Sequence, residues 1–270
     1  MQMICPICKH EPASLSIWED PATHETHFKC YYSIAGRCHP TAIAYALQAL
    51  GFNTPPPQSY SPAQHSKTYM EIWQAGIDIV GTHADEYLHA RCIQAPSNFR
   101  NVLRFIPYLK HIPSNSLRLP CLLALITNPR TATHQGLYRT YLHPLNPEKA
   151  AALPNRQTLG KVDGGVIDLT YLPSKHVTIC EGLETALSYR QMFKDANVWC
   201  AMGVGNLPRI MMPDYVREVT IAADNDDAGV AAAGFAKDVY TKMGLRTEIR
   251  RPHDNFKDFN DQLYAAISRS

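Results

Sequence analysis

The sequence has no run of 18 apolar residues, which is the length that a membrane-spanning helix needs. Its first ten residues, MQMICPICKH, lack the basic region and apolar stretch of a secretory signal. The G-x-x-x-x-G-K-[ST] motif of helicase motors is also missing. We therefore expect a cytoplasmic protein without membrane contact, in which the eight cysteines stay reduced and close cysteine pairs are metal ligands rather than disulfides.

Charge is nearly balanced, at a net +2, but it is unevenly distributed along the chain. Residues 1–90 carry a net −4, residues 91–161 a net +9 and residues 162–270 a net −3. A basic middle beside an acidic end suggests a polyanion that the middle holds and the end presents to metal ions. A solvated basic face is the alternative that charge alone leaves open.

Composition divides the chain into four segments. Residues 1–50 are rich in cysteine and histidine, and residues 51–68 form a linker rich in Pro, Ser and Gln. Residues 69–170 are the basic subdomain, in which only a helix over 84–93 and a strand over 136–142 are readable. Residues 171–270 form the last segment.

In that last segment, apolar strands alternate with helical patterns. The strands are expected at 176–180, 198–202, 217–224 and 245–251, and the helices at 182–194, 228–243 and 258–267. This alternation predicts an α/β domain with a parallel sheet and crossover helices. Ligands of such sheets gather at the carboxyl ends of the strands.

Carboxylates follow several of these strands. Glu181 comes directly after the first, Asp224 and Asp226 end the third, and Asp258 follows the fourth. Oxygen ligands that converge on one edge suit Mg²⁺, a hard cation, and the metal would relieve the repulsion between them. Helix capping by Asp224, Asp226 and Asp227 is the alternative, although one Asp suffices for a cap.

The cysteines of the first segment have metal-ligand spacing. Cys5 and Cys8 form a C-x2-C knuckle. Two strand-like runs separate it from the next pair, Cys30 and Cys38. Four thiolates from two knuckles would hold structural Zn²⁺ in a zinc ribbon. The second knuckle is wider than usual, so His39 or His27 could replace one cysteine, and ordinary buried cysteines are the alternative.

The motifs CEGLETAL, AADNDDAG and KDFND resemble those of the toprim domain, and most closely those of the toprim DNA primases of phages and plasmids. The stretches IWQAGIDIVGTHADEYLHARCI and GLYRTYL…RQTLGKVDGG are similar to the region before that domain. Many bacterial primases have Asp where this chain has Thr185, but the phage and plasmid group commonly has Thr there.

This resemblance implies a DNA primase that makes short RNA primers on single-stranded DNA from nucleoside triphosphates. Asp224, Asp226 and Asp258 would hold two Mg²⁺ (or Mn²⁺) ions, one activating the primer 3′-hydroxyl and one stabilising the pyrophosphate. Glu181 would bind metal or act as general base. The implied nucleic-acid or nucleotide contacts are Arg139, Lys161, Arg104, Lys257 and Asn260.

Other functions stay open. A toprim nuclease would use the same metals to hydrolyse phosphodiesters, and a non-catalytic accessory protein would bind single strands only. A topoisomerase is disfavoured because its gate domains would not fit in 270 residues. Since the helicase motif is missing, unwinding would come from a separate replicative helicase. Gly164 and Gly165 either let the backbone approach a ligand or form a plain turn.

Overall fold

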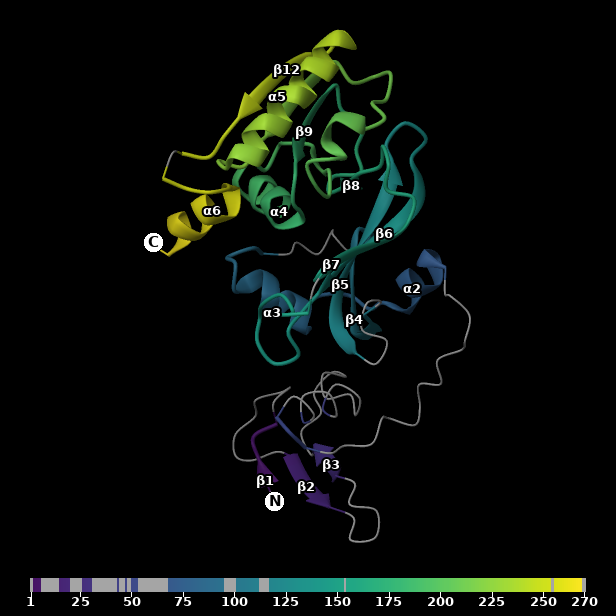
Figure 1. The fold of residues 1–270 in the computed structure, drawn as a ribbon, viewed down its shortest axis with the longest axis vertical. Coiled ribbons are helices and arrows are strands. Elements are labelled where there is room, and N and C mark those ends of the chain that lie inside the picture. Colours follow the sequence, from purple (N-terminus) through teal and green to yellow (C-terminus); the bar gives the residue numbers. More distant parts are fainter. Residues whose placement is uncertain are drawn as a thin grey trace.

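Among the residues that it describes, the computed structural model has three sheets, arranged along the chain as Figure 1 shows. It describes residues 2–5, 15–19, 26–30, 43, 47, 50–52, 68–94, 101–111, 117–152, 154–253 and 255–268. No helix in these ranges is long and apolar enough to cross a membrane.

The first sheet is small and antiparallel. It consists of β1 (Gln2–Met3), β2 (Leu15–Glu19) and β3 (Thr26–Cys30), in that order. A core of its own lies beside it, made of Cys5, Leu15, Ile17, Ile43 and Leu47. The two strands expected in this segment are therefore confirmed. The predicted zinc site falls mainly outside the described residues, because they include neither Cys8 nor Cys38 nor the side chain of Cys30.

The second sheet is antiparallel throughout, in the order β4-β5-β6-β7. Its strands are β4 (Leu103–Lys110), β5 (Arg118–Asn128), β6 (Thr133–Tyr141) and β7 (Arg156–Gly160). Helix α2 (Tyr69–Ala75) packs on one face, where Trp73 joins the cluster of Leu123 and Leu125. Helix α3 (His83–His89) packs on the other, where Tyr87 joins the cluster of Leu122 and Ala124. Both faces are thus covered, so every strand residue of β5 between its ends is buried.

The third sheet has the order β12-β11-β9-β10-β8. Its strands are β8 (Ile167–Asp168), β9 (His176–Cys180), β10 (Val198–Cys200), β11 (Glu218–Ala222) and β12 (Arg246–Arg250). All neighbours are parallel except β8 and β10, so the expectation of a largely parallel sheet is confirmed.

Helices cover both faces of this third sheet. Helices α4 (Leu183–Met192) and α6 (Phe259–Ile267) pack on the face that carries Cys180 and Cys200. Helix α5 (Asp227–Lys242) and the short η2 (Leu207–Arg209) pack on the opposite face. Alternation along each strand produces this division, because successive side chains point to opposite faces.

One hydrophobic core joins the second sheet to the third. The cluster runs from α3 and β5, through Tyr138 of β6, to α4 and α6, where Leu183 and Phe259 belong to it. Figure 1 shows α3 below α4 and α6 across this junction. The carboxyl edge of the third sheet is therefore held next to the second sheet rather than facing solvent alone.

Candidate active site

The carboxylates of the third sheet lie at its carboxyl edge. Cys180 and Ala222 are partners in the last register position that β9 and β11 share. The chain therefore brings Glu181 and Asp224 out at neighbouring points of the edge. In the parallel pair β11 and β12, Ala222 faces Arg250. The segment after β12 returns to the same edge with Asp258.

Asp224 has one carboxylate oxygen that no described residue satisfies. Its Oδ1 is buried and has no hydrogen-bond partner among the described residues. Burial, together with the charges of Asp258, Glu181 and Asp226, outweighs the opposing charge of Lys257 and raises the pKa of Asp224 to about 7. A buried carboxylate among like charges is costly to keep. Gly229 permits this packing, since a Cβ there would stand 2.9 Å from the backbone oxygen of Asp224.

Two of the other carboxylates also cap helices. Asp226 is the N-cap of α5 and accepts a hydrogen bond from the Gly229 amide at 2.8 Å. Asp258 is the N-cap of α6 and accepts one from the Asp261 amide at 2.9 Å. The capping alternative is therefore correct for Asp226 but not for Asp224. Capping uses one oxygen of each carboxylate, so it leaves the other for a ligand.

Asn225, which sequence reasoning passed over, fixes the loop that carries Asp258. Its side-chain amide donates to the carbonyl of Phe256 at 2.8 Å and to that of Pro252 at 3.2 Å. Its backbone amide donates to the carbonyl of Lys257 at 2.7 Å. These bonds bind the segment between β12 and α6 to the end of β11. The motif Asp-Asn-Asp thus needs an amide at its centre to bring the last carboxylate to the edge.

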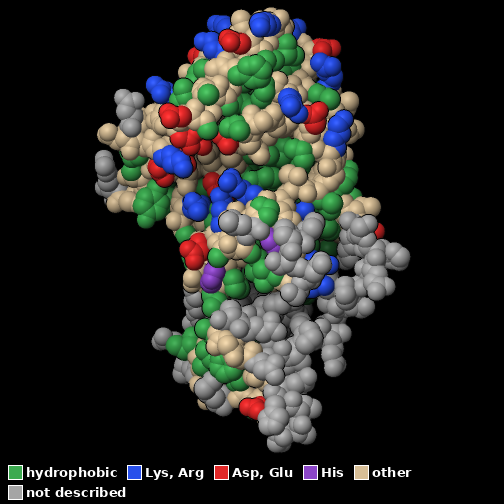
Figure 2. Space-filling model, in the orientation of Figure 1, with side chains coloured by type: hydrophobic (Ala, Val, Ile, Leu, Met, Phe, Trp, Pro, Cys, Tyr) green, Lys and Arg blue, Asp and Glu red, His purple; other side chains and the backbone are tan. Residues whose placement is uncertain are grey.

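A basic residue of the second sheet faces the acidic edge. Burial and the charge of Asp226 raise the pKa of Glu181, whereas the charges of Arg156 and Lys257 lower it. Arg156 begins β7 and so comes from the second sheet rather than the third. Lys257 is exposed next to Asp258. Figure 2 shows Lys and Arg side chains beside acidic ones where the two halves meet. Arg156 was not among the predicted residues. The motif NRQTLG contains it, but alternation alone does not show which face of β7 turns to the edge.

The structure does not bring Arg139 or Arg104 to this edge. Arg139 is 2% exposed and donates to the Thr158 carbonyl at 2.9 Å. It shares its face of the second sheet with α2, because it alternates with Tyr138, which faces the third sheet. Arg104 also lies on the α2 side, where it donates to the Trp73 carbonyl at 3.0 Å and stacks on the Trp73 ring. Arg104 therefore holds α2 against the second sheet, whereas Arg139 bonds within that sheet.

The other predicted contacts divide in the same way. Lys161 is exposed just beyond β7, so it is free to meet a ligand. Asn260 is buried, and its amide donates to the Arg91 carbonyl at 2.9 Å and to the Ser188 hydroxyl at 3.0 Å. These bonds tie α6 to α4 and to the end of α3. Gly164 and Gly165 are buried in a turn closed by a bond from Gly165 to the Val162 carbonyl, so the turn alternative holds for them.

Whether the acidic edge suits a metal ion depends on the donor atoms that it offers. Within the described ranges, no three His, Cys, Asp or Glu side chains are gathered closely enough to hold an ion. The donors at the edge nevertheless fit a hard cation. Asp224 has a buried oxygen without a partner and a pKa raised partly by three neighbouring carboxylates. A cation there would satisfy the oxygen and remove the repulsion.

Comparisons with known proteins agree with this geometry. Residues 63–169 match the model of a domain of unknown function (DUF7146), and residues 176–267 match that of the toprim domain. No curated protein matches the chain. The third sheet with its helices and acidic edge is therefore a toprim domain, as the sequence motifs indicated.

The fold is similar to solved structures of primases. A DNA primase domain from Pseudomonas aeruginosa is 12% identical, with a TM-score of 0.53 over 73% of this chain and 73% of that one. The Aquifex aeolicus primase, in its zinc-binding and RNA polymerase domains, is 14% identical, with a TM-score of 0.54 over 99% of this chain and 77% of that one. Both TM-scores exceed 0.5, and at such low identities they show a likeness of fold alone, so the chain carries its toprim domain in a primase-like fold.

Proposed function

We propose that this chain, a toprim domain set in a primase-like fold, synthesises short RNA primers on single-stranded DNA. The reaction would be nucleotidyl transfer, in which the 3′-hydroxyl of one nucleotide attacks the α-phosphate of the next and releases pyrophosphate. The observation that carries the proposal is the acidic edge. Asp224 has a buried oxygen there without a hydrogen-bond partner among the described residues, beside Glu181, Asp226 and Asp258, and Arg156 faces the same edge.

Each residue of the edge has a role that its surroundings support. Asp224, Asp226 and Asp258 would hold Mg²⁺ or Mn²⁺, which would neutralise charge on the reacting phosphates. Glu181 would complete this ligand set or accept the proton of the attacking hydroxyl, and its raised pKa suits a proton acceptor. Arg156 and Lys257 would contact the triphosphate, because both are basic and close to the acidic groups.

The remaining segments would serve the nucleic acid. Lys161 is exposed beyond β7 and would contact the backbone of the template or primer. The N-terminal module, residues 1–50, would contact single-stranded template. It would hold structural Zn²⁺ through Cys5, Cys8, Cys30 and Cys38. A separate replicative helicase would supply the single strand.

One incubation separates this proposal from its alternatives. The chain is mixed with single-stranded DNA, labelled nucleoside triphosphates and Mg²⁺ or Mn²⁺, and the products are resolved by length. Template-dependent short RNA supports the proposal, provided that an Asp224→Asn variant purified in parallel makes none. Shortened DNA would instead identify a nuclease, and retention of DNA without any product would identify a binding protein.

A further inference from the structure

A buried ion pair joins the part of the chain that carries the second sheet to the toprim domain, close to the acidic edge. Lys149 Nζ lies 2.8 Å from Glu184 Oε1, and the Tyr87 hydroxyl donates to the same oxygen at 2.6 Å. Glu184 lies in the first turn of α4, three residues after Glu181. Lys149 comes from the connection between β6 and β7, and Tyr87 from α3. Three elements therefore meet at one carboxylate.

The Glu184 carboxylate is charged in the folded protein. Burial raises its pKa, but the charge of Lys149 and the hydrogen bonds from Lys149 and Tyr87 outweigh burial and bring the pKa to about 2. A buried pair of this kind adds little to stability compared with apolar groups of the same size. What it does supply is a fixed geometry, since one oxygen must meet both partners.

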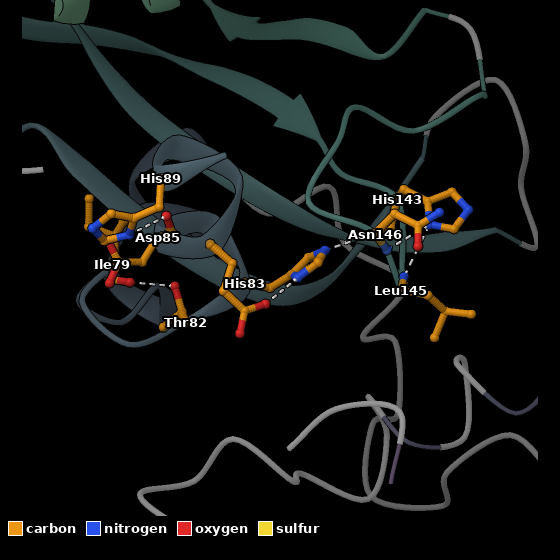
Figure 3. Close-up of polar contacts among 9 residues, drawn as sticks. Ile79, Thr82, His83, Asp85, His89, His143, Leu145 and Asn146 are labelled. Carbon is orange, nitrogen blue, oxygen red and sulfur yellow. Dashed lines mark hydrogen bonds and ion pairs between the residues drawn. The ribbon is translucent and has the colours of Figure 1, made fainter. Parts of the chain in front are cut away.

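The connection that carries Lys149 is itself held firmly. Leu142 and Lys149 form an isolated β-bridge that closes it into a loop. Figure 3 shows how α3 holds the start of this loop: His83 Nε2 lies 2.6 Å from the His143 carbonyl oxygen. The other ring nitrogen of His83 lies 3.1 Å from Glu86. The chain then runs from this loop into β7, which begins at Arg156.

Arg156 lies on the face of the second sheet that Tyr138 turns toward the third, because it pairs with Thr140, two residues along β6 from Tyr138. From that face it lies within reach of the charge of Glu184, which raises the pKa of the guanidinium. Arg156 also acts on Glu181 at the acidic edge. Glu184 therefore attracts both Lys149, which lies within the connection, and Arg156, which lies at its end where β7 begins.

We propose that the Lys149–Glu184 pair is a positioning device that sets the start of β7 against the toprim domain, so that Arg156 faces Glu181. Glu184 and Lys149 are positioning residues: they act through Arg156 and do not touch the reacting groups. The inference rests on the proposed function for the importance of Arg156, but the placement of Arg156 can be measured without catalysis.

The first test observes Arg156 directly. Its side-chain Nε–H signal is assigned in the ¹⁵N spectrum of the full chain by its loss in Arg156→Lys. In Lys149→Met, we expect this signal to shift or to broaden by exchange with water, whereas Lys237→Met on the exposed face of α5 leaves it in place. Tyr87→Phe, which removes only one hydroxyl, serves if Lys149→Met does not fold. An Arg156 signal unchanged in both variants would overturn the proposal.

The second test is a double-mutant cycle on nucleotide affinity. Lys149→Met should weaken binding of a fluorescent nucleoside triphosphate on the order of tenfold, and Lys149→Arg should restore part of it. In an Arg156→Ala background, Lys149→Met should have no further effect, because the residue through which it acts is gone. Additive losses would contradict positioning. A wild-type chain that makes no primer while its Arg156 signal moves in Lys149→Met would count against the proposed function alone.

Discussion

The surroundings of Asp224 make a contribution of their own to the pH dependence of stability. Its pKa is about 7 in the folded chain against 3.8 ordinarily. Because the folded state disfavours the charged form, the contribution of Asp224 to stability should fall as pH rises from about 4 to about 7 and level off above. Asp224→Asn should remove this loss and unfold later in urea at pH 8 without divalent ions, by an amount on the order of a few kcal/mol. The same variant should make no primer.

Asp227 offers the matched control for this prediction. It belongs to the same acidic motif, but it is exposed in the first turn of α5, and the main charges that raise the pKa of Asp224 are those of Asp258, Glu181 and Asp226. Asp227→Asn should therefore lower stability slightly through the helix dipole, by about 0.3–1 kcal/mol. Addition of Mg²⁺ should stabilise the wild type and Asp227→Asn but not Asp224→Asn. Equal stabilisation of all three would show that Mg²⁺ binds elsewhere.

At the level of single residues, the sequence located the acidic edge better than the basic one. Motif and strand order sufficed to place Asp224, because the carboxyl ends of parallel strands all lie at the same edge of a sheet. Arg139 was expected to contact nucleic acid or nucleotide, yet it is buried on the α2 side of the second sheet. Alternation in GLYRTYL predicts that Tyr138 and Arg139 point to opposite faces, but not which face meets the toprim domain. That choice depends on the packing of α3 against α4 and α6, which lies far away in the sequence.

At the level of elements, the N-caps of α5 and α6 combine two tasks that one substitution can separate. Ser accepts the same amide hydrogen bond as Asp but carries no charge. Asp226→Ser should keep the free energy of unfolding within about 0.5 kcal/mol of the wild type, whereas Asp226→Ala should lose about 1 kcal/mol. Both variants should lose primer synthesis, because both remove a proposed metal ligand. Urea unfolding and the primer assay on the same preparations test this, and full activity of Asp226→Ser would reduce Asp226 to a cap.

Some elements could be predicted from sequence patterns and others could not. Helix α5 was predicted within about one residue of its start because small residues and an acidic cap define it. Strand β5 was missed, although it is the longest strand among the described residues. It is buried on both faces, so RLPCLLALITN has no alternation, and Pro120 within it argues against a central strand. Burial on two faces is a property of the fold and leaves no period in the sequence.

At the level of the whole molecule, the N-terminal module has a core separate from the other clusters. If zinc holds this module, Cys5→Ser should abolish binding of one zinc ion per chain, because Cys5 is a proposed ligand. The toprim domain should remain folded, since its clusters contain no residue of the module. Elemental analysis of protein purified without chelator measures the zinc, and circular dichroism the fold. Cys121→Ser, at a buried cysteine of β5, should keep the zinc.

A bound single strand should contact basic residues of the second sheet as it reaches the acidic edge of the third. Binding of single-stranded DNA without divalent ions should weaken with salt, the logarithm of affinity falling by about 0.7 per phosphate contact for each unit of log salt. Arg156→Ala and Lys161→Ala should each make this slope shallower by about one contact, because both residues lie where the second sheet faces the edge or solvent. Fluorescence anisotropy of a labelled oligonucleotide across a salt series measures the slope.

Arg139→Met is the control that gives this measurement its meaning. It removes the same charge from the same half of the chain, but from a buried site bonded to the Thr158 carbonyl. We expect an unchanged slope and a lower free energy of unfolding, since an internal hydrogen bond to a charged group is lost. If Arg139→Met alone altered the slope, the nucleic acid would run along the α2 side of the second sheet. The acidic edge would then receive its substrate from a direction that leaves Arg156 out of contact.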